Sequence, residues 1–170
     1  MATIRSHALT IGLFGVLSAA GCVLPPPPGE LVPPRVEVLA GDARSTRYGG
    51  SAAQVFEDPA IRDKVRALFG PAWSAGREGG LSEAAGLFFS TSSPPKTLRI
   101  GDREYLAVSG CMATACSTRR GLVLVGADGE RLLARVDDGG FTFHFGFGPG
   151  MTAMTPQDRL LVDAAWGALR

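Results

Sequence analysis

The sequence predicts an α+β domain in which an antiparallel sheet of about five strands is flanked by an N-terminal and a C-terminal helix. Three observations support this fold class. A helical stripe of apolar residues occupies residues 58–69, short apolar runs separated by turn signals follow over residues 98–147, and a capped helical pattern begins at residue 155. Helices that stand before and after a block of strands, rather than between the strands, are typical of α+β domains.

Residues 1–21 are typical of an export signal. Arg5 gives the start a positive charge, and residues 9–17 form an uncharged apolar core. A membrane span needs about 20 apolar residues, so this core is too short to be one. The run Ala20-Gly21-Cys22 resembles the bacterial lipobox, in which the cysteine is lipidated and becomes the new N-terminus. The alternative is an ordinary cleaved signal followed by an incidental cysteine.

A lipobox implies where the protein resides. Several acyl chains on Cys22 would suffice for stable anchoring in a membrane. Val23 takes the position at which an aspartate would retain a lipoprotein at the inner membrane, so we expect the outer membrane of a bacterial cell envelope, facing the periplasm. That compartment is oxidising. Of the three cysteines, Cys111 and Cys116 then remain, and we expect them to form a disulfide.

The composition separates a tether from a folded domain. Half of the 12 prolines lie in residues 25–34, a run that favours extended polyproline II and suits a stiff spacer. We therefore expect a signal peptide (1–21), a lipidated cysteine with a proline-rich tether (22–47) and one α+β domain (48–170). The chain has 17 basic and 16 acidic residues. This near-neutral balance lacks the basic footprint of a nucleic-acid-binding protein.

A helix is the first confident element of the domain. Before it, residues 35–39 could form an edge strand and residues 51–56 a turn of helix. The helix itself is predicted with Asp58 as its N-cap, Pro59 at its first position and Gly70 just past its end. Four apolar residues at i, i+4, i+7 and i+8 form one stripe along it: Ile61, Val65, Leu68 and Phe69.

A long loop leads from this helix to the strands. Residues 75–93 are rich in Gly, Ser and Ala. We expect Leu87-Phe88-Phe89 to enter the core from this loop, and Trp73, just before the loop, to lie in the core as well.

Two hairpins are predicted after the loop. Gly101-Asp102 separates strand-like residues 98–100 and 105–108, and a two-residue connection of this composition is a hairpin signal. Residues 122–125 and 131–136 flank a second connection that contains Asp128-Gly129, which is a strong hairpin signal as well.

A final strand and a final helix complete the fold. Residues 141–147 place four phenylalanines at strict period two, so we expect one face of this strand to be buried. Thr155 as N-cap, Pro156 at N1 and Asp158 at N3 resemble a capping box. The apolar face of the helix is expected to carry Trp166 at its edge and to consist of Leu161, Ala164, Ala165, Ala168 and Leu169.

The candidate site is the segment from Cys111 to Cys116. Apolar, strand-like runs lead into it and out of it, so the spacing predicts two adjacent strands whose connecting loop is closed by the disulfide. A disulfide needs Cα atoms about 4.4–6.8 Å apart, which a four-residue connection permits. The four residues are Met112, Ala113, Thr114 and Ala115. A rigid loop suits recognition because little ordering entropy is lost on binding. The alternative is a structural staple of a small exported domain.

Signatures of catalysis are scarce, and we expect no enzyme activity, cofactor or metal site. His144 is the only histidine outside the signal, so a triad would depend on that residue alone, and we expect a solvent-facing or hydrogen-bonded strand residue instead. The C-x4-C spacing differs from the C-x-x-C of thiol oxidoreductases. Asp137-Asp138 is followed by Gly139-Gly140, which indicates a turn rather than a carboxylate pair.

Several of these segments together resemble the inhibitor of vertebrate lysozyme (Ivy) family. The resemblance is carried by residues 95–108, by the C-x4-C loop after them, and by an arginine at 119 or 120 before an apolar strand. The helix from Asp58 followed by Pro71-Ala72-Trp73 also fits the start of that family. The resemblance covers most of residues 48–136.

The resemblance implies a mechanism as well as a fold. It implies an antiparallel sheet flanked by helices, an envelope location, and a loop Cys111–Cys116 that enters the active-site cleft of a c-type lysozyme or another glycan-cleaving enzyme. Blocking two catalytic carboxylates requires only a rigid plug. Where the family's loop has proline and histidine, this sequence has Ala113 and Thr114, so no ionisable group remains there. The alternative is an Ivy-like fold without inhibitory activity that serves as an envelope interaction or structural module.

Overall fold

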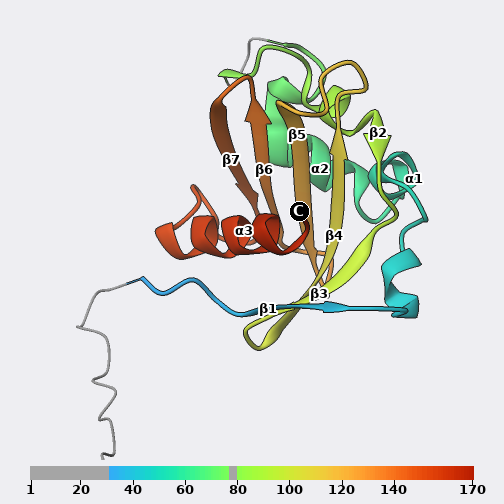
Figure 1. Ribbon diagram of the computed structural model, residues 1–170, viewed down its shortest axis with the longest axis vertical. Helices are drawn as coiled ribbons and strands as arrows, with labels where there is room; N and C mark the ends of the chain where they lie inside the picture. The colour runs from blue at the N-terminus through green and yellow to red at the C-terminus, as the bar shows by residue number, and fades with distance from the viewer. Residues whose placement is uncertain (1–30, 77–79) are drawn as a thin grey trace, which may run out of the picture. The chain divides into compact units, whose positions relative to one another are not determined.

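A computed structural model describes residues 31–76 and 80–170 of the chain (Figure 1). The expected signal peptide and the lipidated Cys22 lie outside the described residues, so both stay predictions, as does the division into signal, tether and domain. None of the helices in the described ranges is long and apolar enough to span a membrane.

The fold class is confirmed, since the domain combines helices with a seven-stranded antiparallel sheet. The strands run in the order β1-β3-β4-β5-β6-β7, and β2 pairs with β4. Their bounds are β1 (Val36–Leu39), β2 (Thr91–Ser92), β3 (Lys96–Ile100), β4 (Arg103–Cys111), β5 (Arg119–Gly126), β6 (Leu132–Asp138) and β7 (Phe141–Phe147). The sheet exceeds the expected five strands because the short β1 and β2 join it. The two residues of β2 are too few to show the alternation that predicts a strand.

The helix predicted from Asp58 begins later, at Arg62, and the turn of helix expected over residues 51–56 is present as a separate short helix. The α-helices are α1 (Ala52–Glu57), α2 (Arg62–Phe69) and α3 (Pro156–Ala168), and the 3₁₀ helices are η1 (Ala43–Thr46), η2 (Gly70–Trp73) and η4 (Ala85–Phe89). The expected helix start at Asp58 is wrong, because Asp58 ends α1. Its carboxylate accepts a hydrogen bond from the Ala60 backbone N–H (2.8 Å), which forms a turn before α2. Gly70 follows α2 with a φ of 57°, as expected.

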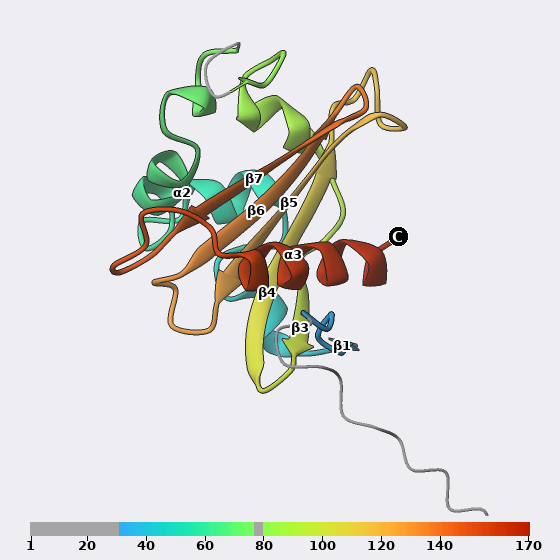
Figure 2. The ribbon, with the colours of Figure 1, turned by 90° about the vertical axis from the view of Figure 1, so that its left-hand side faces the viewer.

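The sheet carries a hydrophobic core on each face. Helix α2 lies against one face and α3 against the other (Figure 2). Along β5, Val123 and Val125 belong to the core beneath α1 and α2, whereas Leu122 and Leu124 belong to the core beneath α3. Burial on both faces explains why this strand is a continuous apolar run rather than an alternating one.

The hairpins and the last strand agree with the predictions. Gly101 and Gly129 have φ of 61° and 74°, the left-handed conformation that these turns require. Phe143, Phe145 and Phe147 pack against the first core. Phe141 does not, because it is 72% exposed at the end of the sheet, and the expectation of four buried phenylalanines is wrong there.

Three further side chains lie elsewhere than expected. Phe88 and Phe89 enter the core, but Leu87 is 46% exposed. In α3, the predicted capping box is present. Trp166 is 6% exposed and belongs to the core rather than to its edge, while Ala168 is exposed. The buried stripe of α3 runs through residues spaced i, i+3 and i+4, namely Val162, Ala165 and Trp166.

Candidate functional site

The predicted loop and the β6–β7 hairpin lie together at one end of the sheet (Figure 2). Cys111 pairs with Arg120 across β4 and β5, and Arg119 pairs with Asp138 across β5 and β6. The Gly139 backbone N–H donates to the Thr118 carbonyl oxygen (3.2 Å) and joins the two connections. We refer to residues 111–120 and 137–142 as the loop end of the sheet.

The disulfide between Cys111 and Cys116 is present, with Cα atoms 4.9 Å apart. Backbone hydrogen bonds fix the loop in addition. The Met112 N–H donates to the Arg119 carbonyl oxygen (3.0 Å), the Ala115 N–H to the Met112 oxygen (2.9 Å) and the Arg119 N–H to the Ala115 oxygen (2.8 Å). The loop is therefore folded before any partner binds, which limits the ordering entropy lost on binding.

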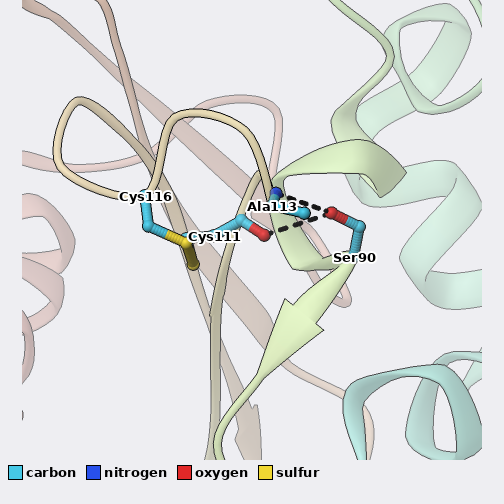
Figure 3. Close-up of a disulfide and its surroundings, with 4 residues drawn as sticks. All are labelled: Ser90, Cys111, Ala113 and Cys116. Carbon is cyan, nitrogen blue, oxygen red and sulfur yellow. Dashed lines mark hydrogen bonds between the residues drawn. A yellow bond between two sulfur atoms is a disulfide. The ribbon is translucent and has the colours of Figure 1, made fainter.

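Ser90 ties the loop to the rest of the domain (Figure 3). Its hydroxyl donates to the Cys111 carbonyl oxygen (3.3 Å) and accepts a hydrogen bond from the Ala113 N–H (3.2 Å). Because Ser90 directly follows η4, the loop is held from outside its own hairpin.

The surface that the loop presents is small and uncharged. Ala113, Thr114 and Cys116 are exposed, and Cys111 and Ala115 are half-buried. Met112 packs against the first core, so it anchors the loop rather than offering its side chain to a partner. Of the six predicted residues, Thr114 is thus the exposed one with a side-chain hydrogen-bonding group.

Two glycines beneath the loop allow the η4–β2 segment to approach the sheet closely. Gly110 and Gly121 pair with each other in the β4–β5 ladder. A Cβ at Gly110 would lie 2.8 Å from the Phe89 Cα and 2.9 Å from the Thr91 carbonyl oxygen, and one at Gly121 would collide with the Phe89 ring. The absence of side chains at this pair lets the η4–β2 segment pack on the sheet and brings Ser90 to the loop.

Asp138 anchors the loop end on the face of α1 and α2. Its side chain is 6% exposed and pairs with Arg119 (3.1 Å between the Arg119 Nε and the Asp138 Oδ1). It also accepts hydrogen bonds from the Ser82 backbone N–H (2.6 Å) and hydroxyl (2.8 Å). The Arg119 Nη1 in turn lies 3.6 Å from the Met112 sulfur. One buried carboxylate thereby connects the loop, the hairpin and the segment around Ser82.

Removal of this carboxylate is expected to destabilise the domain. Asp138→Ala should lower the free energy of unfolding by about 2 kcal/mol, because hydrogen bonds to charged groups are worth about 1.5–3 kcal/mol. Arg119 is one-third exposed, so water can solvate the charge that is left. Urea denaturation measures the effect. Asp138→Asn keeps an acceptor oxygen, so its free energy of unfolding should fall less. An equal fall in the two variants would contradict this account.

A group of arginines surrounds Trp166 on the face of α3. The guanidinium carbons of Arg135, Arg120 and Arg170 lie 4.8, 5.3 and 5.8 Å from the Trp166 ring centroid. Arg135 donates to Asp137 (2.9 and 3.2 Å) and to Asp163 (2.9 Å). Burial alone would lower the pKa of Arg135, but hydrogen bonds and the charges of these carboxylates outweigh burial and hold its pKa above the ordinary value.

Phe141 stands between two hollows at the loop end. One, of about 430 Å³, lies on the side of Arg119 and Asp138 and extends to Ser82. The other, of about 240 Å³, lies on the side of Arg120 and is also lined by Ser117, Thr118, Asp137, Gly140, Thr142 and Arg170. An exposed aromatic ring flanked by polar hollows is a feature of protein interfaces, where aromatic residues act as anchors.

His144 is a hydrogen-bonded strand residue, as expected. Its Nε2 lies 2.8 Å from the Asp163 carboxylate, which also accepts from Arg135. Within residues 31–76 and 80–170, no group of three or more His, Cys, Asp or Glu side chains could hold a metal ion.

A further hollow lies at the opposite end of the sheet. It measures about 910 Å³ and is lined by the β3–β4 and β5–β6 turns and by residues 148–155. Its buried Asp158 forms an ion pair with Arg131. These two charges neutralise each other.

Comparisons of the chain with models of protein families, with curated proteins and with solved structures gave no match. Three residues in or beside the loop end were not predicted to belong to the site. Ser90, Asp138 and Phe141 lack a local sequence pattern that predicts where they lie relative to the loop. Arg120 was noted only as part of the Arg119-Arg120 pair, yet the two arginines lie on opposite faces of the sheet.

Proposed function

We propose that the domain is a protein inhibitor that binds a glycan-cleaving enzyme, with a c-type lysozyme as the first candidate, through the loop Cys111–Cys116. In this proposal the chain is an Ivy-like lipoprotein, anchored through Cys22 at the outer membrane and facing the periplasm. The observation that carries the proposal is the loop itself, which is exposed, closed by a disulfide and fastened from outside by Ser90.

The physical requirements of such an inhibitor are modest. Glycosidases of this kind cleave their substrate with two carboxylates in a cleft, so a rigid segment that fills the cleft blocks the reaction without chemistry of its own. The loop is pre-ordered by its hydrogen bonds, and pre-organisation raises affinity because less conformational entropy is lost.

The alternative is the same fold as an envelope interaction or structural module without inhibitory activity. The composition of the loop favours it, because Met112 to Ala115 contain no charged group that could form an ion pair with a carboxylate. A missing charge-assisted hydrogen bond costs about 1.5–3 kcal/mol, which is a tenfold to hundredfold loss of affinity.

A measurement of binding to a c-type lysozyme distinguishes an inhibitor from a module without inhibitory activity. Residues 31–170 hold the whole sheet and both cores, so this segment is suited to calorimetry against lysozyme with residual lysozyme activity measured in parallel. Submicromolar binding with loss of activity is expected. No binding at high micromolar concentration would rule out this target and favour the alternative.

The double variant Cys111→Ser/Cys116→Ser tests the role of the loop. We expect affinity to fall at least about tenfold, because the loop must then be ordered on binding. Stability should fall by only about 2 kcal/mol, since the disulfide closes a very small ring. Ser90→Ala serves as the matched control that removes the outer brace and keeps the disulfide, and it should lose less affinity. Inhibition that is unchanged in the double variant would place the binding surface elsewhere.

A further inference from the structure

Arg120 is the charged residue at the loop end whose charge is not engaged by an acid. It pairs with Cys111 across the ladder, so it lies directly at the base of the loop. Its neighbour Arg119 pairs with Asp138, and Arg135 pairs with Asp137 and Asp163. In the described part of the chain, the Arg120 side chain has neither a hydrogen bond nor an ion pair, and its guanidinium carbon lies 5.3 Å from the Trp166 ring centroid.

Two hollows meet at Arg120. The smaller, of about 190 Å³, extends from Cys111 to Trp166 and has no acidic residue in its lining. It is bordered by the hydroxyl-bearing residues Thr91, Ser93 and Ser109, and by Ser92, whose hydroxyl is already engaged by the Ala52 backbone N–H (3.2 Å). The second is the hollow of about 240 Å³ next to Phe141, which adds Arg170 and the hydroxyls of Ser117, Thr118 and Thr142.

One carboxylate borders the second hollow, but it is already engaged. Asp137 accepts two hydrogen bonds from Arg135 (2.9 and 3.2 Å) and one from the Thr142 hydroxyl (2.9 Å). Arg170 is 3.9 Å from it. Asp137 lies opposite Arg120 in the β5–β6 ladder, but its hydrogen bonds are made with Arg135 and Thr142, and it forms no ion pair with Arg120. Both hollows therefore offer an incoming anion a guanidinium without an ion-pair partner, bordered by hydroxyl-bearing residues.

The chemistry of Arg120 suits a carboxylate. A guanidinium presents a planar fork of N–H donors that matches the two oxygens of a carboxylate, and stacking on an aromatic ring leaves the in-plane donors available. Trp166 is 6% exposed and fixed in the second core, so it supports the guanidinium with a rigid surface.

We propose that Arg120 binds an Asp or Glu side chain of the partner protein at the base of the disulfide loop, and so supplies the charged contact that the loop tip lacks. This inference rests on the proposed function, since it assigns the partner an acidic cleft or rim. An acidic protein surface is favoured as occupant because the exposed loop and Phe141 lie beside the site and would be covered by the same partner.

The first test does not depend on the identity of the partner. Hexaglutamate is titrated at low salt into residues 31–170 while the NMR resonances of the Arg120 side chain and the Trp166 indole are followed. We expect saturable shifts of both, and an affinity about tenfold or more lower in Arg120→Gln. Arg103→Gln, in the turn region at the opposite end of the sheet, makes the same charge change and should keep the affinity. Absent shifts, or equal losses in the two variants, would overturn the proposal.

The second test compares the same variants against lysozyme. If the wild-type domain binds, Arg120→Gln should weaken binding at least about tenfold and Arg103→Gln should not. Equal binding by wild type and Arg120→Gln would overturn the inference and leave the proposed function intact. If the wild-type domain fails to bind, the proposed target is wrong, and the hexaglutamate titration alone decides whether Arg120 is a carboxylate site.

Discussion

Replacement of Trp166 by alanine is expected to lower the free energy of unfolding by about 3–5 kcal/mol, because truncation of a buried large aromatic residue removes its burial and leaves a cavity. The indole is 6% exposed within the core beneath α3. It also faces the guanidinium groups of Arg120, Arg135 and Arg170, and those contacts would be lost as well. Denaturation by guanidinium chloride measures the change.

Trp166→Phe is the matched control for this variant. It keeps a ring against the arginines, and it removes an indole N–H that is buried without a hydrogen-bond partner among the described residues. An unpaired buried donor costs free energy, so its removal offsets part of the lost packing, and we expect a net loss of about 1 kcal/mol or less. A loss in Trp166→Phe as large as in Trp166→Ala would show that the indole nitrogen, rather than the aromatic surface, is what the site requires.

The sequence alone predicted the structure correctly where residues adjacent in the chain determine it. Asp128-Gly129 and Gly101-Asp102 specify tight connections, because glycine adopts the positive φ that they need. The strand Phe141–Phe147 has the predicted bounds, and the capping box of Thr155 and Asp158 is formed. The disulfide was also predictable, since a short connection between two strands keeps both cysteines within reach.

The predictions were wrong where one sequence pattern is compatible with two different local structures. Asp58-Pro59 suits the start of a helix, but the same aspartate also forms a turn by accepting a hydrogen bond from Ala60, and the turn prevails. For Phe141, period two correctly indicates the face on which it lies. Periodicity does not indicate how far the covering helices reach, and Phe141 lies beyond them.

The candidate site depended on contacts that sequence proximity cannot reveal. Ser90 reaches the loop from 21 residues before Cys111, and Arg120 meets Trp166 from another element. The loop was therefore found from its cysteines, whereas the groups that brace it and the cation beside it were not. These groups decide whether the loop is a staple or a recognition surface, because a disulfide alone would serve either role.

Gly110→Ala adds one methyl group beneath the loop and is expected to lower the free energy of unfolding by about 3 kcal/mol. The added Cβ would meet the Phe89 Cα at 2.8 Å and the Thr91 carbonyl oxygen at 2.9 Å, both of them backbone atoms that no rotamer change can move aside. The η4–β2 segment must then shift away from β4. Because Ser90 lies in that segment, its two hydrogen bonds to the loop should be lost together with the packing.

Gly167→Ala makes the same chemical change where there is room for it. Gly167 lies within α3, and its added Cβ would have no atom within 4 Å other than its chain neighbours and the backbone of its own helix. Alanine favours the helix over glycine by up to about 1 kcal/mol, so this variant should be slightly more stable than the wild type. Amide hydrogen exchange of Ala113 separates a loosened loop from a merely destabilised domain, since its N–H is bonded to Ser90. In Gly110→Ala we expect this amide to exchange faster than the global loss of stability explains, whereas exchange that follows global stability alone would show that the glycine pair does not position the loop.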